Sequence, residues 1–334
     1  MGETGAAIGL DVLALGMMMG EVAPTRAGVA VGEAAGLVLF PSGSTTIFAL
    51  ALARLGAGVG VLSRVGDDDL GRWMLSELGG AGIDTADVAA VPGQLTPLAL
   101  ASVDAAGRKT YAFYRFPGFS DPLATLRAGE VADAMLRRAR LFDVGEASLR
   151  SPELRGETLA LLRRARGLGL AVCYTPNYRP SAWRGGEAEA VAAQREVIAL
   201  ADIALMNAAE AALIAGEADP AAAVRAVAAL GPRTVVVTDG AADILVAGAG
   251  AGGVARLPAV PVEVVFDIGA GDAFHAGFLA AWATGAGPLG CAHFAAHAAA
   301  LKIARPPDPA LLPTRAEVLA ALGDSGLRAE GVVG

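Results

Sequence analysis

A glycine-rich turn with one carboxylate stands just before an apolar, helix-like stretch within residues 266–281. Helix starts leave backbone N–H groups unpaired and carry the positive end of the helix dipole, so small residues at Gly269, Ala270 and Gly271 would let a phosphoryl group approach. Asp272 would repel that anion, and we therefore expect it to act as a general base for an attacking hydroxyl. Aspartate is also common as a helix N-cap, and the local pattern alone does not separate these two roles.

The composition excludes several other classes of function. The chain has 334 residues, a hydrophobic content of 54% and a net charge of -8, and it shows no basic stretch typical of nucleic-acid binding. Its only lysines are Lys109 and Lys302, and no glycine is followed directly by lysine. A Walker A loop requires that Gly-Lys pair, so a phosphotransferase with this sequence must bind phosphate without a P-loop.

The cysteines and the uncharged stretches bear on the compartment. Cys173 and Cys291 lie far apart in apolar surroundings and lack metal-site spacing, so we interpret them as buried free thiols of a cytoplasmic protein. Residues 1–10 show no signal-peptide pattern, and the long uncharged stretches at 34–53 and 273–301 are interrupted by polar or turn-forming residues. We therefore expect no membrane-spanning segment.

Short β-prone runs alternate with Ala-, Leu- and Arg-rich segments of helical length along most of the chain. The expected strands are Val12–Leu15, Val59–Ser63, Leu141–Val144, Ala171–Tyr174, Ile203–Met206 and Thr234–Thr238. The expected helices are Thr46–Leu55, Leu70–Ala81, Glu130–Arg140, Pro152–Gly167, Gly186–Ala201 and Ala221–Leu230. This alternation predicts an α/β fold with a doubly wound, mostly parallel sheet flanked by helices on both faces.

Residues 27–40 and 97–115 break this rhythm, because Val, Leu, Tyr and Phe alternate there with small or polar residues. They predict a small additional β-layer, built from discontinuous segments at about 17–40 and 95–118, within a single domain spanning residues 1–334. Ligands of open α/β sheets bind at the carboxyl ends of the strands, so this layer would act as a lid. Its exposed edges lead us to expect a homodimer formed through the lid. The glycines at 248–253 indicate a hairpin tip.

Several motifs follow one another in order over nearly the whole chain. They are Ser42–Gly56, Val61–Gly71, Ala81–Asp84, Asn207–Glu210, Val235–Gly240, Gly269–Phe274 and Leu311–Val318. Together they resemble the ribokinase-like (PfkB) carbohydrate kinase family. The resemblance implies a βαβ core with a small β-lid, ATP as phosphoryl donor, Mg2+, and transfer to a sugar hydroxyl. It favours Asp272 as the base, with the N–H groups of Gly269–Gly271 stabilising charge on the transferred group.

The resemblance also implies residues for the nucleotide and the metal. Asn207 and Glu210 match a motif that helps hold Mg2+, often through water, with helix capping as the alternative. Thr238 and Gly240 match the strand end beside the nucleotide, although Gly240 would serve equally as a turn glycine. His297 lies in a region that resembles the family's base-binding helix, and we expect it near adenine.

Two further segments concern the acceptor. Tyr111–Arg115 and Pro176–Trp183 resemble the corresponding parts of 2-keto-3-deoxygluconate kinases and close relatives. An acid sugar carries a carboxylate, which the planar forks of Arg115 and Arg179 would bind, with ordinary surface ion pairing as the alternative. The residues expected to bind the acceptor are Glu21, Ser42, Gly43, Ile47, Phe113, Arg115, Asn177 and Arg179.

These acceptor positions depart from the family pattern. Ile47 stands where relatives usually have Asn, Ser42 replaces the first of two glycines, Glu21 and Thr175 each stand at a usual Asp, and Phe113 replaces a Tyr. Losing polar groups removes hydrogen bonds to sugar hydroxyls, so the alternatives are another small acceptor (fructose, a nucleoside or a sugar phosphate) or a non-catalytic sugar-binding relative. Residues 266–268 also differ from the usual Asp-Thr-Thr, so activation by a monovalent cation cannot be assumed.

Overall fold

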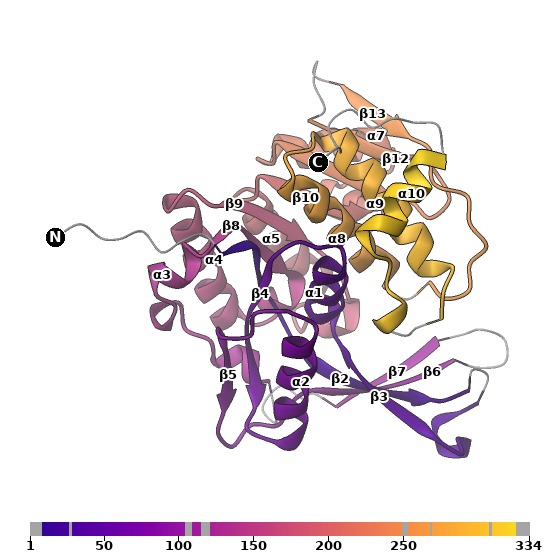
Figure 1. The fold of residues 1–334 in the computed structure, drawn as a ribbon. Coiled ribbons are helices and arrows are strands. Elements are labelled where there is room, and N and C mark those ends of the chain that lie inside the picture. The colour runs from indigo at the N-terminus through magenta and orange to yellow at the C-terminus, as the bar shows by residue number, and fades with distance from the viewer. Residues whose placement is uncertain are drawn as a thin grey trace.

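A nine-stranded, mostly parallel sheet forms the centre of the molecule (Figure 1). The computed structural model describes residues 9–26, 29–103, 109–114, 121–248, 253–267, 269–306 and 309–324, and within them the strand order is β13-β12-β11-β10-β9-β8-β1-β4-β5. The strands are β1 (Leu10–Leu15), β4 (Val59–Gly66), β5 (Val88–Val91), β8 (Ala139–Gly145), β9 (Ala171–Thr175), β10 (Ile203–Asn207), β11 (Thr234–Thr238), β12 (Ile244–Ala247) and β13 (Val254–Leu257). Neighbours pair in parallel except at β12, which is antiparallel to β11 and β13. The expected α/β fold class is confirmed.

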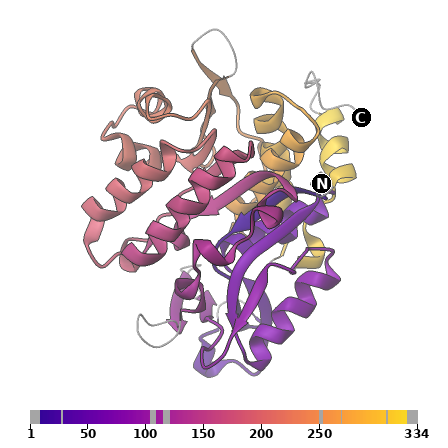
Figure 2. The same cartoon turned by 90° about the vertical axis from the view of Figure 1, so that its left-hand side faces the viewer.

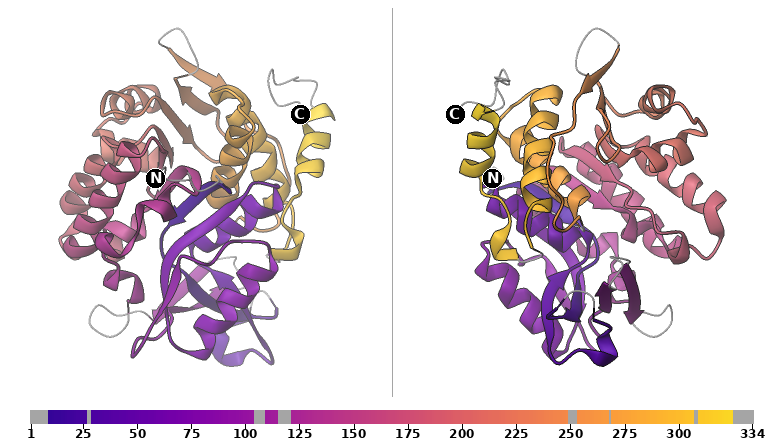
Figure 3. Two further views of the ribbon diagram at one scale, coloured as in Figure 1. Left: turned by 60° about the vertical axis from the view of Figure 1, so that its left-hand side comes forward. Right: turned by 90° about the vertical axis from the view of Figure 1, so that its right-hand side faces the viewer.

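Helices cover both faces of this sheet, as the two views of Figure 3 show. Figure 2 looks onto the face that carries α4 (Pro152–Gly167), α5 (Gly186–Ile198), α6 (Ala208–Ala215) and α7 (Pro220–Ala229). The opposite face carries α1 (Ser44–Arg54), α2 (Asp69–Gly80), α8 (Ala270–Ala283), α9 (Pro288–Ile303) and α10 (Arg315–Asp324). Two helical layers therefore enclose the sheet and bury both of its faces.

The central strand β1 shows how the sequence specifies two cores. Val12 and Ala14 belong to the core beneath α1 and α8, whereas Leu13 and Leu15 belong to the core beneath α4 and α5. All four side chains are fully buried. Successive side chains of a strand point to opposite faces, so a continuous apolar run is what a strand covered on both sides requires.

A small four-stranded sheet projects from the body beside α2 (Figure 1). Its order is β3-β2-β6-β7, and its strands are β2 (Met19–Pro24), β3 (Leu37–Ser42), β6 (Leu98–Val103) and β7 (Lys109–Tyr114). These strands come from the two discontinuous segments in which an additional β-layer was expected. That this sheet closes as a lid, and that the chain is one domain, stay predictions.

One expected helix is wrong. Instead of a helix over residues 130–140, the structure has only the short α3 (Asp133–Leu136), and strand β8 already begins at Ala139. The carbonyl of Arg138 accepts hydrogen bonds from the backbone N–H groups of Gly9 and Leu10, and Ala139 pairs with Leu10 of β1. Pairing with a strand far away in the sequence therefore overrides the local helical preference.

Two further expectations concern the hairpin and membrane spanning. β12 and β13 form an antiparallel pair around the glycine-rich tip, whose residues 249–252 lie outside the described part. Within the described residues, none of the helices has the length and apolar character needed to cross a bilayer.

Candidate active site

The glycine-rich turn leads directly into helix α8. Gly269 is the N-cap residue and has a φ of 76°, in the left-handed region that favours glycine. A Cβ atom at Gly269 would lie 3.3 Å from Cγ2 of Ile47, whereas a Cβ atom at Gly271 would meet nothing within 4 Å. The Ala270 N–H donates a hydrogen bond to the carbonyl oxygen of Asp267 (3.2 Å). The turn is thus packed against α1 at Gly269 and open at Gly271, and the expected three-donor anion site stays a prediction.

Asp272 lies in the first turn of α8, in a partly buried position. Its carboxylate accepts a hydrogen bond from the hydroxyl of Ser44 at the start of α1, while Gly269 occupies the N-cap position. Burial raises the pKa of Asp272, and the Ser44 hydrogen bond together with nearby positive charges partly offsets this rise. The charges come from His275, Arg179 and Lys302. The carboxylate therefore lies among groups from three distant parts of the chain.

Ser44 was missed as a site residue by the sequence reasoning. It is 228 residues away from Asp272 along the chain and reaches it because α1 packs beside α8. Gly43 precedes it with a φ of 92°, and a Cβ atom there would lie 2.9 Å from the carbonyl oxygen of Met17. A serine directly after a glycine at a helix start was the available signal, but nothing local indicated its partner.

The small sheet contributes a buried carboxyl group, Glu21 of β2. The hydroxyl of Ser42 donates a hydrogen bond of 2.5 Å to Glu21, and burial raises the pKa of this carboxyl group. The pKa of Tyr111 on β7 is raised to about 12, chiefly by burial and then by the charge of Glu21, while Arg179 opposes the rise. Phe113 is exposed and stacks its ring on that of Tyr111.

The expected acceptor residues are thus only partly brought together. Glu21 and Ser42 are in contact, and Arg179 acts electrostatically on Tyr111 of the same small sheet. Arg115 lies outside the described residues. The two-arginine carboxylate site therefore rests on Arg179 alone.

A second carboxylate, Glu210, joins two of the expected motifs. Its Oε1 accepts a hydrogen bond from the Tyr178 N–H (2.8 Å) and its Oε2 from the Asn207 N–H (3.0 Å). The side chain of Asn207 in turn caps the Glu210 N–H. Asn177 adopts a left-handed conformation with a φ of 48°. Burial raises the pKa of Glu210, and the hydrogen bonds from the Asn207 and Tyr178 N–H groups, followed by the charge of Arg179, partly offset this rise. Glu210 thus attaches the 176–179 loop to the end of β10.

The expected metal and nucleotide residues meet at the carboxyl edge of the sheet. Asn207 of β10 pairs in register with Thr238 of β11, and Gly240 follows in an exposed turn with a φ of 55°. The capping box of Asn207 and Glu210 is the structural role that the sequence left open as the alternative. A carboxylate has about four acceptor positions, so two N–H bonds leave Glu210 able to bind a water of a hydrated Mg2+ ion. The metal role stays a prediction.

His297 is buried in α9, and its ring contacts His293 of the same helix. Its Nδ1 lies 3.0 Å from the carbonyl oxygen of His293, and the two imidazole rings meet edge to face. Burial lowers the pKa of His293, and the neighbouring His297 lowers it further. A contact of His297 with adenine stays a prediction.

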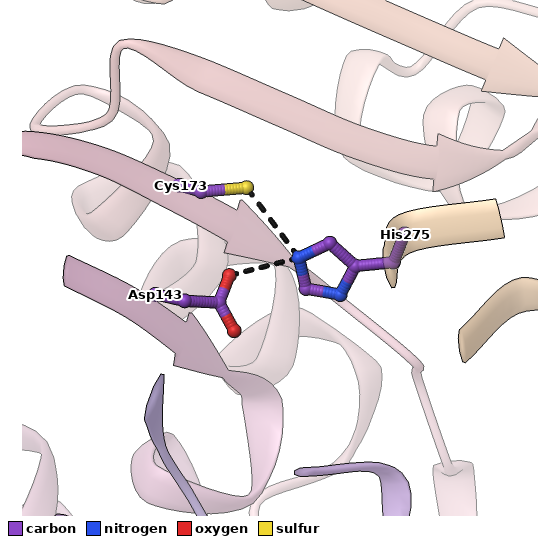
Figure 4. Close-up of side chains that lie close together, drawn as sticks. All are labelled: Asp143, Cys173 and His275. Carbon is purple, nitrogen blue, oxygen red and sulfur yellow. Dashed lines mark hydrogen bonds and ion pairs between the residues drawn. The ribbon is translucent and has the colours of Figure 1, made fainter. Parts of the chain in front are cut away.

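A buried polar group surrounds His275, which follows Asp272 by about one turn of α8 (Figure 4). Nε2 of His275 lies 2.9 Å from Oδ1 of Asp143 on β8 and 3.6 Å from Sγ of Cys173 on β9. Oγ1 of Thr175 lies 3.3 Å from the other ring nitrogen of His275. Burial raises the pKa of Cys173 well above its usual range, so the thiol keeps its proton.

This group fits a hydrogen-bonded network better than a metal centre. Two ligands with bonds of about 2.0 Å on tetrahedral zinc lie roughly 3.3 Å apart, which is more than the separation of the His275 and Asp143 atoms. The network ties α8 to β8 and β9, and it fixes the helix that carries Asp272. Sequence reasoning missed it because its members come from three separate elements.

Comparisons with known proteins identify the family of this chain. Residues 10–315 match the family described as pfkB family carbohydrate kinase. The chain belongs to this family. Within it, the chain is 34% identical over 176 residues to Fructokinase-1 of Oryza sativa subsp. japonica and 33% identical to Fructokinase-1 of Zea mays. Each match covers 53% of this chain and 54% of the plant protein, so the chain spans about half the length of the curated relatives it matches.

Solved structures extend the likeness over almost the whole chain. The PfkB protein from Polaromonas sp. JS666 is 27% identical, with a TM-score of 0.80 and coverage of 93% of this chain and 99% of that one. A fructokinase with bound ATP from Xylella fastidiosa is 23% identical, with a TM-score of 0.82 and coverage of 95% and 99%. At 23% identity, the likeness to the Xylella fastidiosa structure supports only the fold.

Proposed function

We propose that this pfkB family protein transfers the terminal phosphoryl group of ATP to a sugar hydroxyl. The observation that carries the proposal is the Asp272 carboxylate in the first turn of α8, next to an open glycine and among positive charges. A carboxyl group with a pKa raised by burial is a better proton acceptor than an ordinary aspartate. The family match over residues 10–315 supports the same reaction class.

In the proposed reaction, Asp272 accepts the proton of the attacking sugar hydroxyl. Ser44 orients the carboxylate by its hydrogen bond, and the charge of Arg179 stabilises the ionised form before the proton arrives. The first-turn N–H groups of α8, with Gly271 leaving space for approach, stabilise negative charge on the transferred group. These residues supply positioning and electrostatics, which are the main protein contributions to phosphoryl transfer.

The residues present fit a hydrated magnesium ion and a nucleotide. Glu210 and Asn207 offer oxygens at the end of β10, beside Thr238 at the end of β11. A bound Mg2+ ion would neutralise phosphate charge there, and Mg2+ usually keeps several waters in such sites. We include Gly240 and His297 among the residues near the nucleotide, and the proposal includes no monovalent cation.

We propose two candidate acceptors, in order of preference. An acid sugar of the 2-keto-3-deoxygluconate type is favoured by Arg179, whose charge acts on Asp272 and Tyr111 at once. Fructose is the second candidate, because curated relatives at 33–34% identity are fructokinases. The buried Glu21 suits a neutral acceptor better, since an ionised Glu21 would repel a carboxylate.

A turnover assay with purified protein, ATP and Mg2+ tests the reaction. The acceptors are 2-keto-3-deoxygluconate, fructose, ribose and a nucleoside, and the control variant is Asp272→Asn. Loss of the base should lower kcat by about 10²- to 10⁴-fold. Turnover unchanged in Asp272→Asn would overturn the mechanism, and no turnover on any acceptor would favour a non-catalytic sugar-binding protein.

We further propose a cytoplasmic homodimer that associates through the small sheet. Cys173 and Cys291 are buried free thiols, which suits a reducing compartment. The β3 residues 37–39 expose Leu, Val and Leu at 50%, 43% and 41%, on an edge strand that a second subunit could cover. Sedimentation of the wild type and of Val38→Lys tests this, with a monomeric wild type as the contradicting result.

A further inference from the structure

Lys302 is a buried cation for which the proposed reaction has so far assigned no role. It is 7% exposed and lies near the end of α9, where its Nζ donates a 3.2 Å hydrogen bond to the carbonyl oxygen of Phe266. The same Nζ lies 4.9 Å from the centre of the Phe266 ring. Burying an ammonium group is costly unless it is compensated, and the carbonyl and ring of Phe266 are partners that compensate it here.

The surroundings of Lys302 are the lead-in to the glycine-rich turn. The N–H groups of Val265 and Phe266 both donate to the carbonyl oxygen of Ile303 (2.8 and 3.0 Å). Cε and Nζ of Lys302 each lie 3.8 Å from the position that a Cβ atom would take at Gly269. The end of α9 therefore holds the residues before the turn by their backbone, and the ammonium group lies directly behind the turn.

The choice of lysine is itself informative in this chain. Only two of the 26 basic residues are lysines. An ammonium group is a compact point charge with three donors, whereas a guanidinium group is broad and planar. A buried position against a backbone carbonyl and a glycine suits the smaller cation.

We propose that Lys302 is a positioning residue for phosphoryl transfer, which holds Phe266 ahead of the turn and places a fixed positive charge beside Gly269, at the proposed anion site of α8. Two negative groups must meet at that helix start, namely the Asp272 carboxylate and the transferred phosphoryl group. A cation held by α9 lowers the energy of both without occupying the approach at Gly271. The positive charge of Lys302 also acts to lower the pKa of Asp272. This inference rests on the proposed kinase function.

The test compares Lys302→Met, which keeps the apolar stem and removes the charge, with Arg305→Met. Arg305 also lies at the end of α9, but it is directed to Glu317 and the carbonyl of Leu311. We expect Lys302→Met to lower kcat at least about tenfold, with a smaller change in the KM for ATP. The acidic limb of the pH profile of kcat should move to higher pH, because the ionised form of Asp272 loses a stabilising positive charge. Arg305→Met should leave both unchanged.

Hydrogen exchange gives a readout that does not depend on activity. The N–H groups of Val265 and Phe266 should exchange faster in Lys302→Met than in the wild type, because the lead-in loses one of its fixed bonds. If Lys302→Met does not fold, Lys302→Gln removes the charge and keeps a donor for the Phe266 carbonyl, and its kcat and acidic limb are read in the same way. A folded variant with wild-type kcat and an unmoved acidic limb overturns the inference. The proposed function is judged separately, by wild-type turnover and its loss in Asp272→Asn.

Discussion

The phosphoryl-transfer turn and the acceptor side of the site are held in different ways. Gly269–Asp272 forms one continuous turn, which lies against Ile47 of α1 and Lys302 of α9 at Gly269 and is bonded to Ser44 of α1 at Asp272. The proposed acceptor side is assembled from β2, β3, β7 and the 176–179 loop. A hydrogen bond joins β2 to β3, and another joins the loop to Glu210. The proposed reaction class thus follows from residues adjacent in sequence. Specificity for the acceptor depends instead on how separate segments pack together.

Among the variants that compare these two regions, the largest effect should come from disturbing the turn itself. Gly269→Ala places a side chain at a φ of 76° and 3.3 Å from Ile47, which should cost about 1–3 kcal/mol of stability. A displaced turn should also lower kcat about 100-fold, since errors of about 1 Å in positioning have that effect. The measurements are thermal unfolding and steady-state kinetics.

The matched control is Gly285→Ala, just beyond the other end of α8. Gly285 has a φ of 85° and no neighbour within 4 Å of an added Cβ. It should lose stability while kcat is retained. Equal kinetic losses in both variants would show that the turn has no special role.

On the acceptor side, Arg179→Ala should discriminate between substrates. A hydrogen bond to a charged group contributes about 1.5–3 kcal/mol, so kcat/KM should fall roughly ten- to hundredfold for an acid sugar and far less for fructose. Arg184→Ala removes an exposed arginine nearby and serves as the control. Equal losses on acid and neutral acceptors would contradict carboxylate recognition by Arg179.

Glu210→Gln tests the connection between the 176–179 loop and β10. The side-chain oxygen of a buried glutamine can accept a hydrogen bond from only one of the two N–H groups, those of Tyr178 and Asn207. The free energy of unfolding should therefore fall by about 1–3 kcal/mol. The KM for the acceptor should rise more than kcat falls, because the loop that carries Arg179 loses its attachment. Glu217→Gln changes an exposed glutamate just beyond the end of α6 and should alter neither quantity.

The smallest effect is expected for Ser44→Ala, measured as the pH dependence of kcat. Activity needs ionised Asp272 and falls as the pH drops through the raised pKa of that group. The Ser44 hydrogen bond lowers this pKa, so removing it raises the pKa further and moves the acidic limb to higher pH. At neutral pH the loss should stay below about tenfold.

Ser42→Ala provides the comparison for Ser44→Ala across the two regions. Ser42 donates to Glu21 rather than to Asp272, and Glu21 lies on the acceptor side. The variant should change the KM for the acceptor and leave the acidic limb in place. An identical shift of the limb in both serine variants would contradict the separation between the two regions.

Much of the fold could be predicted, because strand and helix periodicities are local properties. The alternation in β1 shows this directly, with successive residues buried in two different cores. The expected helix at 130–140 failed because the backbone around Arg138 pairs with Gly9 and Leu10, and helix propensity is weaker than such pairing. The region is rich in Ala and Arg, as helices often are, and the pairing with a distant strand prevented the helix.

The sequence by itself determined the turn at 269–272, the absence of a P-loop and the order of the family motifs. Only the tertiary structure decided that Ser44 and Lys302 meet this turn and that Glu210 binds the 176–179 loop. The physical reason is that a turn depends on the φ angles and sizes of adjacent residues. Contacts across 228 residues depend instead on how whole helices pack on the sheet, which leaves no local pattern in the chain.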